Sequence, residues 1–315
     1  MTRLRRAALA VLCTLAAAKG HAQSGGSGDS SRFCDAPPTL SVAQQDKLLR
    51  FAAAIKDELD RSGEPVALVA RTGLDLDRFG IHYTHAGISL RDSPELPWAV
   101  RQLYFACDEG RPRIFDQGVT GFALGTYDPA RGHVSMVFLP PAEAASLAQA
   151  ALDKRRTLGL LGATYSANAY PFSLRYQNCN QWVAEMLAGA WGLADDSDAP
   201  RAAAQAWLRN AGYEPGTVTL ASRPWLWLAA LIPWLHNDDH PAEWLDRATY
   251  RVSLPSSIEA FVQARLPGAR RVEVCHTEHQ IVVHPGWAPL PASCEAGPGD
   301  RVIPLDMPAP PAGAG

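Results

Sequence analysis

The spacing of apolar residues changes several times along the chain, and each change predicts a new element. Between Ser41 and Ser62 apolar residues recur about every 3.6 residues, which predicts a helix, and Ser41 is suited to cap its start. Short apolar runs follow, rich in β-branched and aromatic residues and bounded by turn residues, as in strands. These predicted strands cover residues 66–71, 85–90, 98–105, 113–115 and 133–139.

Helical spacing returns in the middle of the chain. It predicts helices at residues 142–158 and 179–191, the second with Asn178 as N-cap and Gly192 after its end. Beyond residue 200 the pattern predicts a helix at residues 202–210, a strand at 252–254, a helix at 258–265 and strands at 271–275 and 280–283. Because helices and strands do not alternate strictly, the predicted fold class is α+β.

The composition excludes several classes of protein. The chain has 315 residues, of which 47% are hydrophobic and 19% charged, as in folded globular proteins. A formal net charge of −3 offers no basic balance for binding nucleic acid, so no nucleic-acid partner is expected. Residues 23–32 are a polar Gly/Ser-rich stretch that predicts a flexible linker, and the Pro/Ala/Gly-rich residues 307–315 predict a disordered tail.

The first 22 residues have the composition of a secretory signal peptide. Three arginines precede an apolar run at residues 7–18, and Ala22 marks the predicted cleavage site. The run is too short for a stable transmembrane anchor. Cleavage removes four positive charges and changes the net charge from −3 to −7. We therefore expect the mature protein in the periplasm or outside the cell.

Five cysteines remain after cleavage, and an odd number cannot pair completely in an oxidising compartment. Cys275 and Cys294 are close in sequence and form the natural first disulfide. Cys34 and Cys107 could form a second, which leaves Cys179 as a free thiol. Spacing does not determine connectivity, so other pairings stay open.

The candidate chemistry lies in two short stretches, with His85 at the start of a predicted strand and Cys179 at the start of a predicted helix. A helix start offers unpaired N–H groups that favour thiolate over thiol and can hold an oxyanion. A nearby neutral imidazole can accept the thiol proton and return it to a leaving group. The imidazole also needs a polar partner that fixes its orientation. Gln102, on the next predicted strand, is the first candidate and Asp116 the second.

Each of these residues also has an ordinary structural interpretation. A cysteine at a helix start is often a small buried apolar residue, and a lone histidine is often structural. His82 lies three residues before His85, faces the opposite side of an extended strand and is the weaker base. Capping and packing also account for the candidate substrate-binding residues, which are Asn178, Asn180, Gln181 and Tyr176.

The order of these residues resembles the circularly permuted NlpC-type papain-like superfamily, in which the histidine strand precedes the cysteine helix. Most of the chain, from about residue 33 to 305, more closely resembles the bacterial family DUF2145, a domain of unknown function. The stretches that carry this resemblance are THAGI, WAVRQL, IFDQG, YQNCNQWV, AWLRNAGYEP, NDDHP, SLPSSIEAFV and RVEVCH. The resemblance implies a permuted papain-like core at residues 33–200, with a small antiparallel sheet on the cysteine helix. A C-terminal α/β extension at residues 201–306 is expected to pack on this core.

The resemblance further implies an exported cysteine hydrolase or acyltransferase that needs no cofactor. Cys179 would be the nucleophile, His85 the general base and Gln102 the orienting residue. The reaction would pass through a Cys179 acyl-thioester on an amide or ester, in a cell-wall peptide or a lipid-linked acyl group. Glutamine departs from the histidine often found at the orienting position, and it stabilises an imidazolium less than an anion would. The competing interpretations are a non-catalytic periplasmic binding or envelope-assembly protein and a disulfide-stabilised structural module.

Two further stretches resemble sites only by composition. His236, Asp238, Asp239 and His240 resemble a metal cluster, but they lie in a loop without a second ligand pair at zinc spacing, so no metal is expected. The uncharged run from Trp225 to Trp234 favours a plain buried helix. The alternatives for this run are a wall of an acyl or cell-wall substrate cleft and a peripheral contact with a membrane surface.

Overall fold

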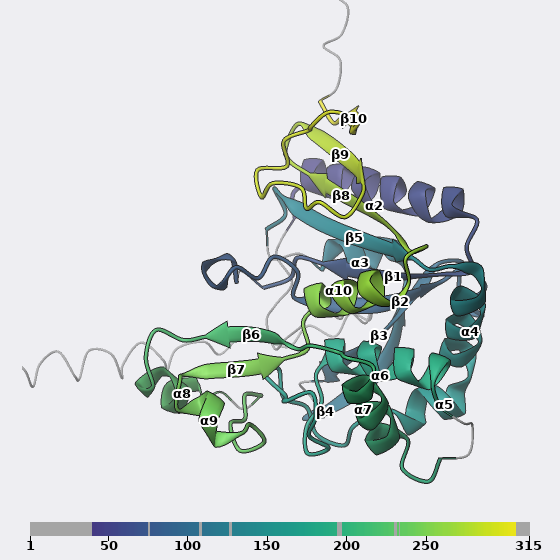
Figure 1. The fold of residues 1–315 in the computed structure, drawn as a ribbon. Coiled ribbons are helices and arrows are strands. Elements are labelled where there is room, and N and C mark those ends of the chain that lie inside the picture. The colour runs from purple at the N-terminus through teal and green to yellow at the C-terminus, as the bar shows by residue number, and fades with distance from the viewer. Residues whose placement is uncertain are drawn as a thin grey trace, which may run out of the picture.

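An eight-stranded antiparallel sheet forms the centre of the protein in the computed structural model (Figure 1). The structure describes residues 40–74, 76–106, 109–125, 128–193, 197–229, 232 and 234–306. The order of strands is β10-β9-β8-β5-β1-β2-β3-β4. Their bounds are β1 Val66–Arg71, β2 His85–Leu90, β3 Ala99–Ala106, β4 Arg111–Gln117, β5 Gly132–Phe138, β8 Arg270–His276, β9 Gln280–Pro285 and β10 Arg301–Pro304. The α+β class is confirmed, but the sheet is larger than the small one that was expected.

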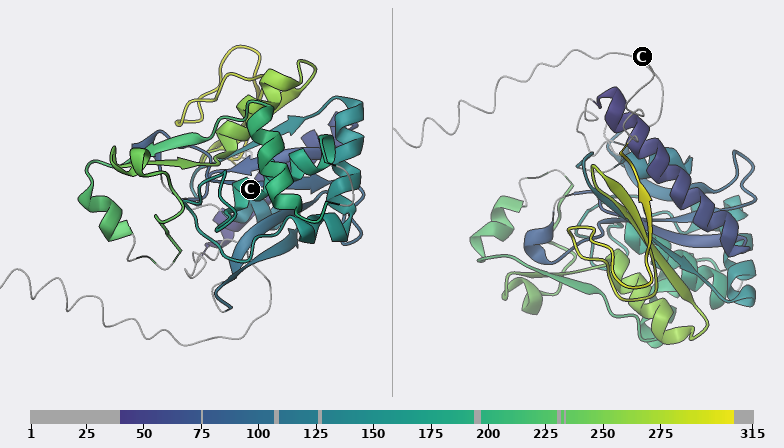
Figure 2. Two further views of the ribbon diagram at one scale, coloured as in Figure 1. Left: turned by 60° about the horizontal axis from the view of Figure 1, so that its bottom comes forward. Right: turned by 90° about the horizontal axis from the view of Figure 1, so that it is seen from above.

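Helices cover both faces of the sheet. One face carries α6, which contacts α4, α7 and α10, and the other carries α2 and α3. In the view from above, α2 and α10 lie on opposite sides of the strands (Figure 2). The helices are α2 Val42–Ser62, α3 Val119–Leu124, α4 Pro141–Leu152, α5 Lys154–Gly159, α6 Cys179–Trp191, α7 Pro200–Asn210 and α10 Pro255–Arg265, with a 3-10 turn at Asp77–Phe79.

The central strands are buried on both faces, which explains their continuous apolar runs. Every residue of β1 and β2 is buried. Ala86, Ile88 and Leu90 belong to the core on the side of α6. Ala67 and Val69 of β1 belong to the core on the side of α2. Successive side chains of each strand therefore enter different cores.

The predicted starts of α2 and α6 are confirmed, whereas α7 and α10 begin two and three residues earlier than predicted and one predicted helix is divided. Ser41 caps α2 in a reciprocal capping box with Gln44. The single helix predicted at residues 142–158 is two helices, because Asp153 leaves the helical conformation. Its side chain instead caps α5 by accepting from the backbone N–H groups of Arg155 and Arg156.

Residues after 200 contribute to two separate parts of the structure. Strands β8, β9 and β10 extend the main sheet, because β8 pairs with β5 along its whole length. A lobe beside the sheet contains β6 Gly216–Thr219, β7 Thr249–Val252, α8 Pro224–Ala229 and α9 Ala242–Leu245. The expected boundary at residue 200 thus does not separate two sheets, since strand pairing across it is continuous.

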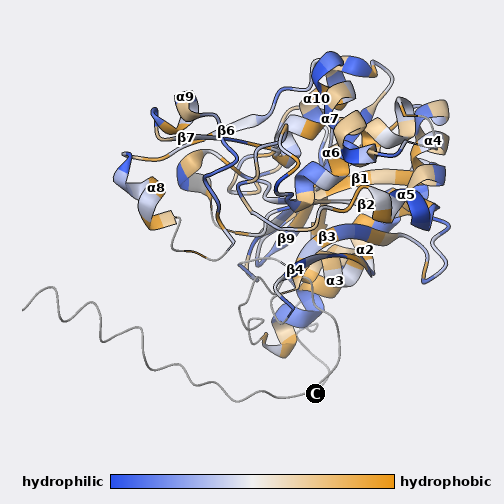
Figure 3. Ribbon diagram, turned by 90° about the horizontal axis from the view of Figure 1, so that it is seen from below, coloured by the Kyte–Doolittle hydropathy of each residue, from blue (hydrophilic) through white to orange (hydrophobic). Residues whose placement is uncertain are grey.

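In the described part of the tryptophan-rich run, α8 lies on the outside of this lobe and Trp234 is partly buried against the main core, so the expected buried helix is wrong. Leu226 is the buried residue of α8 and packs with Tyr250 and Val252. Trp225 is 54% exposed and Trp227 is 80% exposed. Figure 3 shows α8 at the outer end of the lobe, with apolar residues on it. A helix of six residues anchored by one leucine leaves its other apolar side chains in solvent.

The predicted disulfide between Cys275 and Cys294 is confirmed. It joins β8 to the loop that leads into β10, and closing a loop of this length stabilises the fold by about 3 kcal/mol. Cys34 and Cys107, the second predicted pair, lie outside the described residues.

Candidate active site

Cys179 is the first residue of α6 and a free, buried thiol. The predicted N-cap Asn178 is confirmed, since its Oδ1 accepts from the backbone N–H of Gln181 at 2.7 Å. Its Nδ2 donates to the carbonyl of Ala167 at 3.1 Å, which fixes the chain on both sides of the helix start. The cap therefore sets the position of the Cys179 backbone.

His85 is the first residue of β2 and is held by an amide on the neighbouring strand. Its Nε2 lies 2.5 Å from Oε1 of Gln102, whose Nε2 donates to Oε1 of Gln117 at 2.9 Å. An amide oxygen only accepts, so this contact assigns the proton to Nε2 and leaves Nδ1 with a lone pair. Nδ1 is buried and has no hydrogen-bond partner among the described residues. This is the arrangement expected of a general base with an orienting residue.

Gly87 allows β3 to bring Gln102 this close. A Cβ atom at Gly87 would lie 2.6 Å from a methyl group of Val100 and 3.1 Å from the carbonyl oxygen of Arg101. Asp116, the second candidate for the orienting role, instead forms a two-pronged ion pair with Arg101 at 2.7 and 2.5 Å. The structure thus places Gln102, and not Asp116, on the imidazole.

The thiol and the imidazole belong to different faces of the sheet. Cys179 lies in the core on the side of α6, together with Ala86. The His85 ring points to the opposite face, where its centroid lies 6.2 Å from that of Phe122 of α3. The thiol donates to Oδ1 of Asn180 at 3.6 Å, and no hydrogen bond joins it to the imidazole in the part of the chain described.

The start of α6 nevertheless lies beside the start of β2. Residues 85–87 pair with β1 but have no ladder partner on β3, which pairs with β2 from Ile88 to Leu90. Asn180 reaches this point and donates to the carbonyl of Thr84 at 3.2 Å. The backbone N–H of Ala86 lies close enough to the Cys179 sulfur to lower the pKa of the thiol. The sulfur therefore lies next to the residue that follows His85.

Burial keeps both groups neutral in this structure. It raises the pKa of the Cys179 thiol to about 11, although the N–H of Asn180, the charge of Arg71 and the N–H of Ala86 act in the opposite direction. Burial, and secondarily the charge of Arg71, lowers the pKa of His85 to about 3. At neutral pH the pair is thus thiol and imidazole, not thiolate and imidazolium.

The candidate substrate-binding residues have local structural partners. Asn178 and Asn180 make the contacts described above, and Gln181 donates to the carbonyl of Pro171 at 3.3 Å. The ring of Tyr176 stacks on His236, with centroids 4.3 Å apart. These residues shape the chain that leads into α6.

A buried carboxylate in α6 organises the same segment and was missed from the sequence. Glu185 is fully buried and accepts from four side chains, which are Gln177, Gln181, Arg201 and Gln205. Arg201 also donates to the carbonyls of Leu174 and Tyr176, both at 3.0 Å. The spacing of four residues from Gln181 to Glu185 was the available signal, because it is the repeat of one helix face.

The loop at residues 236–240 contacts the segment that leads into α6, and its side chains do not converge on one point. Asp238 pairs with Arg175 at 2.8 Å, and Asp239 accepts from the N–H of Tyr170 at 2.9 Å. His240 contacts the carbonyl oxygen of Asn168 at 2.6 Å. Each of these three residues thus contacts the segment that leads into α6, and His240 also lies 3.8 Å from the carboxylate of Asp239.

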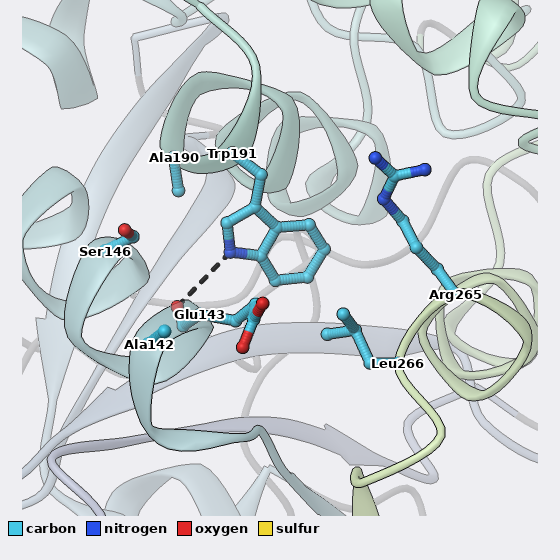
Figure 4. Close-up of a pocket in the computed structure, with 7 residues that line it drawn as sticks. All are labelled: Ala142, Glu143, Ser146, Ala190, Trp191, Arg265 and Leu266. Atoms are coloured by element: carbon cyan, nitrogen blue, oxygen red, sulfur yellow. Dashed lines mark hydrogen bonds between the residues drawn. The ribbon is translucent and has the colours of Figure 1, made fainter.

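A well-defined hollow lies away from these residues. It has a volume of about 420 Å³ and is lined by Ala142, Glu143, Ser146, Ala190, Trp191, Arg265 and Leu266 (Figure 4). Ala190 and Trp191 are at the C-terminal end of α6, while Cys179 is at its start. A second hollow of about 10 Å³ touches Ala86 and Val183, room for about one water molecule. The site around Cys179 is therefore closed.

No helix among the described residues combines the length and apolar character required to cross a membrane. Comparison with known proteins found no match among curated proteins and none among solved structures. Residues 58–262 match the family described as an uncharacterized protein conserved in bacteria, DUF2145. This match covers more than half of the chain, including His85, Gln102 and Cys179. The chain belongs to the DUF2145 family.

Proposed function

We propose that this protein is an exported cysteine hydrolase or acyltransferase with a permuted papain-like fold. The proposal is carried by one observation: Gln102 engages Nε2 of His85, while Nδ1 stays buried and unpartnered among the described residues. In papain-like enzymes, too, one imidazole nitrogen faces the catalytic cysteine and the other contacts the side-chain amide of a third residue. Export is supported by the composition of residues 1–22.

In the proposed reaction Nδ1 of His85 accepts the thiol proton, and the sulfur of Cys179 attacks the carbonyl carbon of an amide or ester. Backbone N–H groups at the start of α6 hold the developing oxyanion. The C–N or C–O bond breaks, His85 returns its proton to the leaving amine or alcohol, and an acyl-thioester remains on Cys179. Water or an acceptor nucleophile then releases the acyl group.

A rearrangement that opens the site and brings Nδ1 of His85 to the Cys179 sulfur must precede this chemistry, because the two side chains lie on different faces of the sheet in this structure. Cys179 and His85 are 4% and 3% exposed, so a substrate carbonyl cannot reach the sulfur in the closed structure. Opening would also admit water, which reduces the burial that holds the pKa of the thiol high and the pKa of the imidazole low. Substrate entry and activation of the pair are thus coupled in the proposal.

A non-catalytic envelope-binding or assembly protein is the second candidate. It is favoured by the burial of both groups, by the raised pKa of the thiol and by the separation of the two side chains across the sheet. In that case Cys179 is a small apolar residue of the core, and His85 with Gln102 and Gln117 is a structural polar cluster.

Labelling of Cys179 by a chloroacetamide probe, followed by mass mapping between pH 5 and pH 10, separates the two candidates. For the enzyme we expect reaction at pH 7 at least as fast as in the urea-unfolded chain, and none in Cys179→Ala. His85→Asn should slow it about 100-fold, the usual contribution of a general base. The matched control is His279→Asn, because His279 is exposed and contacts Asp306.

A slow labelling reaction whose rate does not depend on His85 would contradict the proposal that the protein is an enzyme. A thiol whose pKa is about 11 is deprotonated roughly 300-fold less at pH 7 than an ordinary thiol with a pKa of about 8.5. Labelling that follows this high pKa, unchanged in His85→Asn, would identify Cys179 as a structural residue.

We also propose that the exposed face of α8 contacts a membrane surface, close to cell-wall or lipid-linked substrates. Trp225, Trp227 and Leu228 are each more than half exposed. Tryptophan prefers the boundary between lipid and water. The double variant W225S/W227S is expected to reduce cosedimentation with vesicles of zwitterionic phosphatidylcholine about tenfold. Leu49→Ser, which changes a residue of α2 with 53% exposure, is the matched control, and equal binding of all three proteins would contradict the contact.

A further inference from the structure

Two histidines and a glutamate from distant parts of the chain meet beneath the disulfide-linked loop. His82 precedes β2, His133 lies in β5 and Glu273 lies in β8. One donor atom from each residue lies within 4.8 Å of the donor atoms of the other two. The two imidazole rings are 4.2 Å apart and nearly perpendicular, while His133 and Glu273 are buried. The cluster is separate from Cys179 and His85.

Hydrogen bonds with neighbouring residues fix the orientation of His133 and Glu273, as similar bonds do for the ligands of metal sites. Nε2 of His133 donates to the carbonyl of Pro291 at 3.3 Å, so Nδ1 carries the lone pair that could bind a metal. Metal-binding histidines commonly donate their second nitrogen to a carbonyl in this way. Glu273 accepts at Oε2 from the N–H of Leu290 at 2.8 Å, and at Oε1 from the hydroxyl of Tyr83. Its carboxylate is thus fixed but retains lone pairs for a metal.

Glu273 also has a charged neighbour that any metal would share it with. Arg271 contacts two carboxylates, with Nε 2.9 Å from Glu259 and a terminal nitrogen 2.9 Å from Glu273. Among the described side chains in contact with these two carboxylates, Arg271 is the one cation. A metal ion at Glu273 would therefore share this carboxylate with Arg271.

We propose that His82, His133 and Glu273 bind a zinc ion. Two imidazole nitrogens and one carboxylate oxygen suit zinc, whereas calcium and magnesium prefer oxygen ligands alone. The ligand atoms of a tetrahedral zinc site lie about 3.4 Å from one another. Side-chain rotations that move the three donor atoms by about 1 Å would bring them to this spacing. The ion would tie the segment leading into His85 to β5 and β8.

Zinc titration of the EDTA-treated mature protein, followed by calorimetry, tests this site. We expect one ion per chain with micromolar or tighter affinity, and at least 100-fold weaker binding in His82→Gln and His133→Gln. His82→Gln keeps the test valid if the buried His133 variant does not fold, as checked by circular dichroism. Cobalt in place of zinc should give tetrahedral absorption bands without a sulfur-to-cobalt charge-transfer band.

Two control variants assign the binding to this cluster. His279→Gln removes an exposed histidine and Cys179→Ser removes the free thiol, and both should bind zinc like the parent protein. The proposal is overturned if the parent protein binds no zinc at micromolar concentration, if His82→Gln binds equally well, or if Cys179→Ser abolishes binding. None of these results depends on whether Cys179 is catalytic.

Discussion

Replacement of Glu185 by alanine is expected to destabilise the protein by about 3–5 kcal/mol, the usual cost of breaking a buried ion pair. Its carboxylate is fully buried, and Arg201 beside it has a side chain that is only 11% exposed. Without the carboxylate, this arginine and the amides of Gln177, Gln181 and Gln205 lose a buried acceptor. Each unsatisfied buried donor adds to the cost.

Urea unfolding of Glu185→Ala beside Glu214→Ala measures this effect. Glu214 pairs with Arg251, but its side chain is 84% exposed, so its loss should cost at most about 1 kcal/mol. The double variant E185L/R201L should be more stable than Glu185→Ala, because it leaves no unpaired charge. A cost below about 1 kcal/mol for Glu185→Ala would show that the cluster contributes little to folding.

Local signals in the sequence were sufficient to place the parts of the candidate site on their elements. The capping residue Asn178 and the apolar period after it fix α6, and Cys179 is its first residue. Gln102 was identified as the partner of His85 because adjacent antiparallel strands place polar side chains side by side. Both inferences depend on residues near one another in sequence or on neighbouring strands.

Pairing between distant segments could not be read from the sequence in the same way. The sheet has eight strands because β8 joins the edge of β5, about 130 residues earlier in the chain. Strands buried on both faces lack an alternation of polar and apolar residues, so the face toward which His85 points was not encoded locally. The sequence therefore could not predict that His85 and Cys179 lie on different faces of the sheet.

Composition alone also could not separate a buried tryptophan-rich run from an exposed one. An apolar helix is buried only if enough surface exists to cover it, and the lobe of β6, β7 and α9 offers α8 a small core around Leu226. Glu185 shows the converse, since a charged residue in an apolar helix is buried where an arginine and three amides surround it.

Acid is expected to destabilise the protein through buried histidines, and His276 gives the cleanest measurement. Its ring is buried against Phe51, with centroids 4.5 Å apart, and burial lowers its pKa from 6.5 to about 4. Between these two pH values the unfolded chain binds a proton that the folded chain does not. Stability is therefore lost as pH falls below about 6.5, by about 1.4 kcal/mol per pH unit.

Because of His276, the free energy of unfolding should be about 2.5 kcal/mol lower at pH 4.5 than at pH 7.5. His276→Phe should remove that part of the acid sensitivity. Any packing cost of phenylalanine is the same at both pH values and cancels from the difference. The measurement is urea unfolding of both proteins at pH 7.5 and 4.5, with His279→Phe as the exposed control. An equal loss of stability in the parent protein and in His276→Phe would mean that His276 is protonated in the folded protein at pH 4.5. The acid sensitivity would then come from other groups, such as His85 and His133, whose pKa values burial lowers, or Asp60, whose pKa is lowered by hydrogen bonds from Lys56 and Trp98.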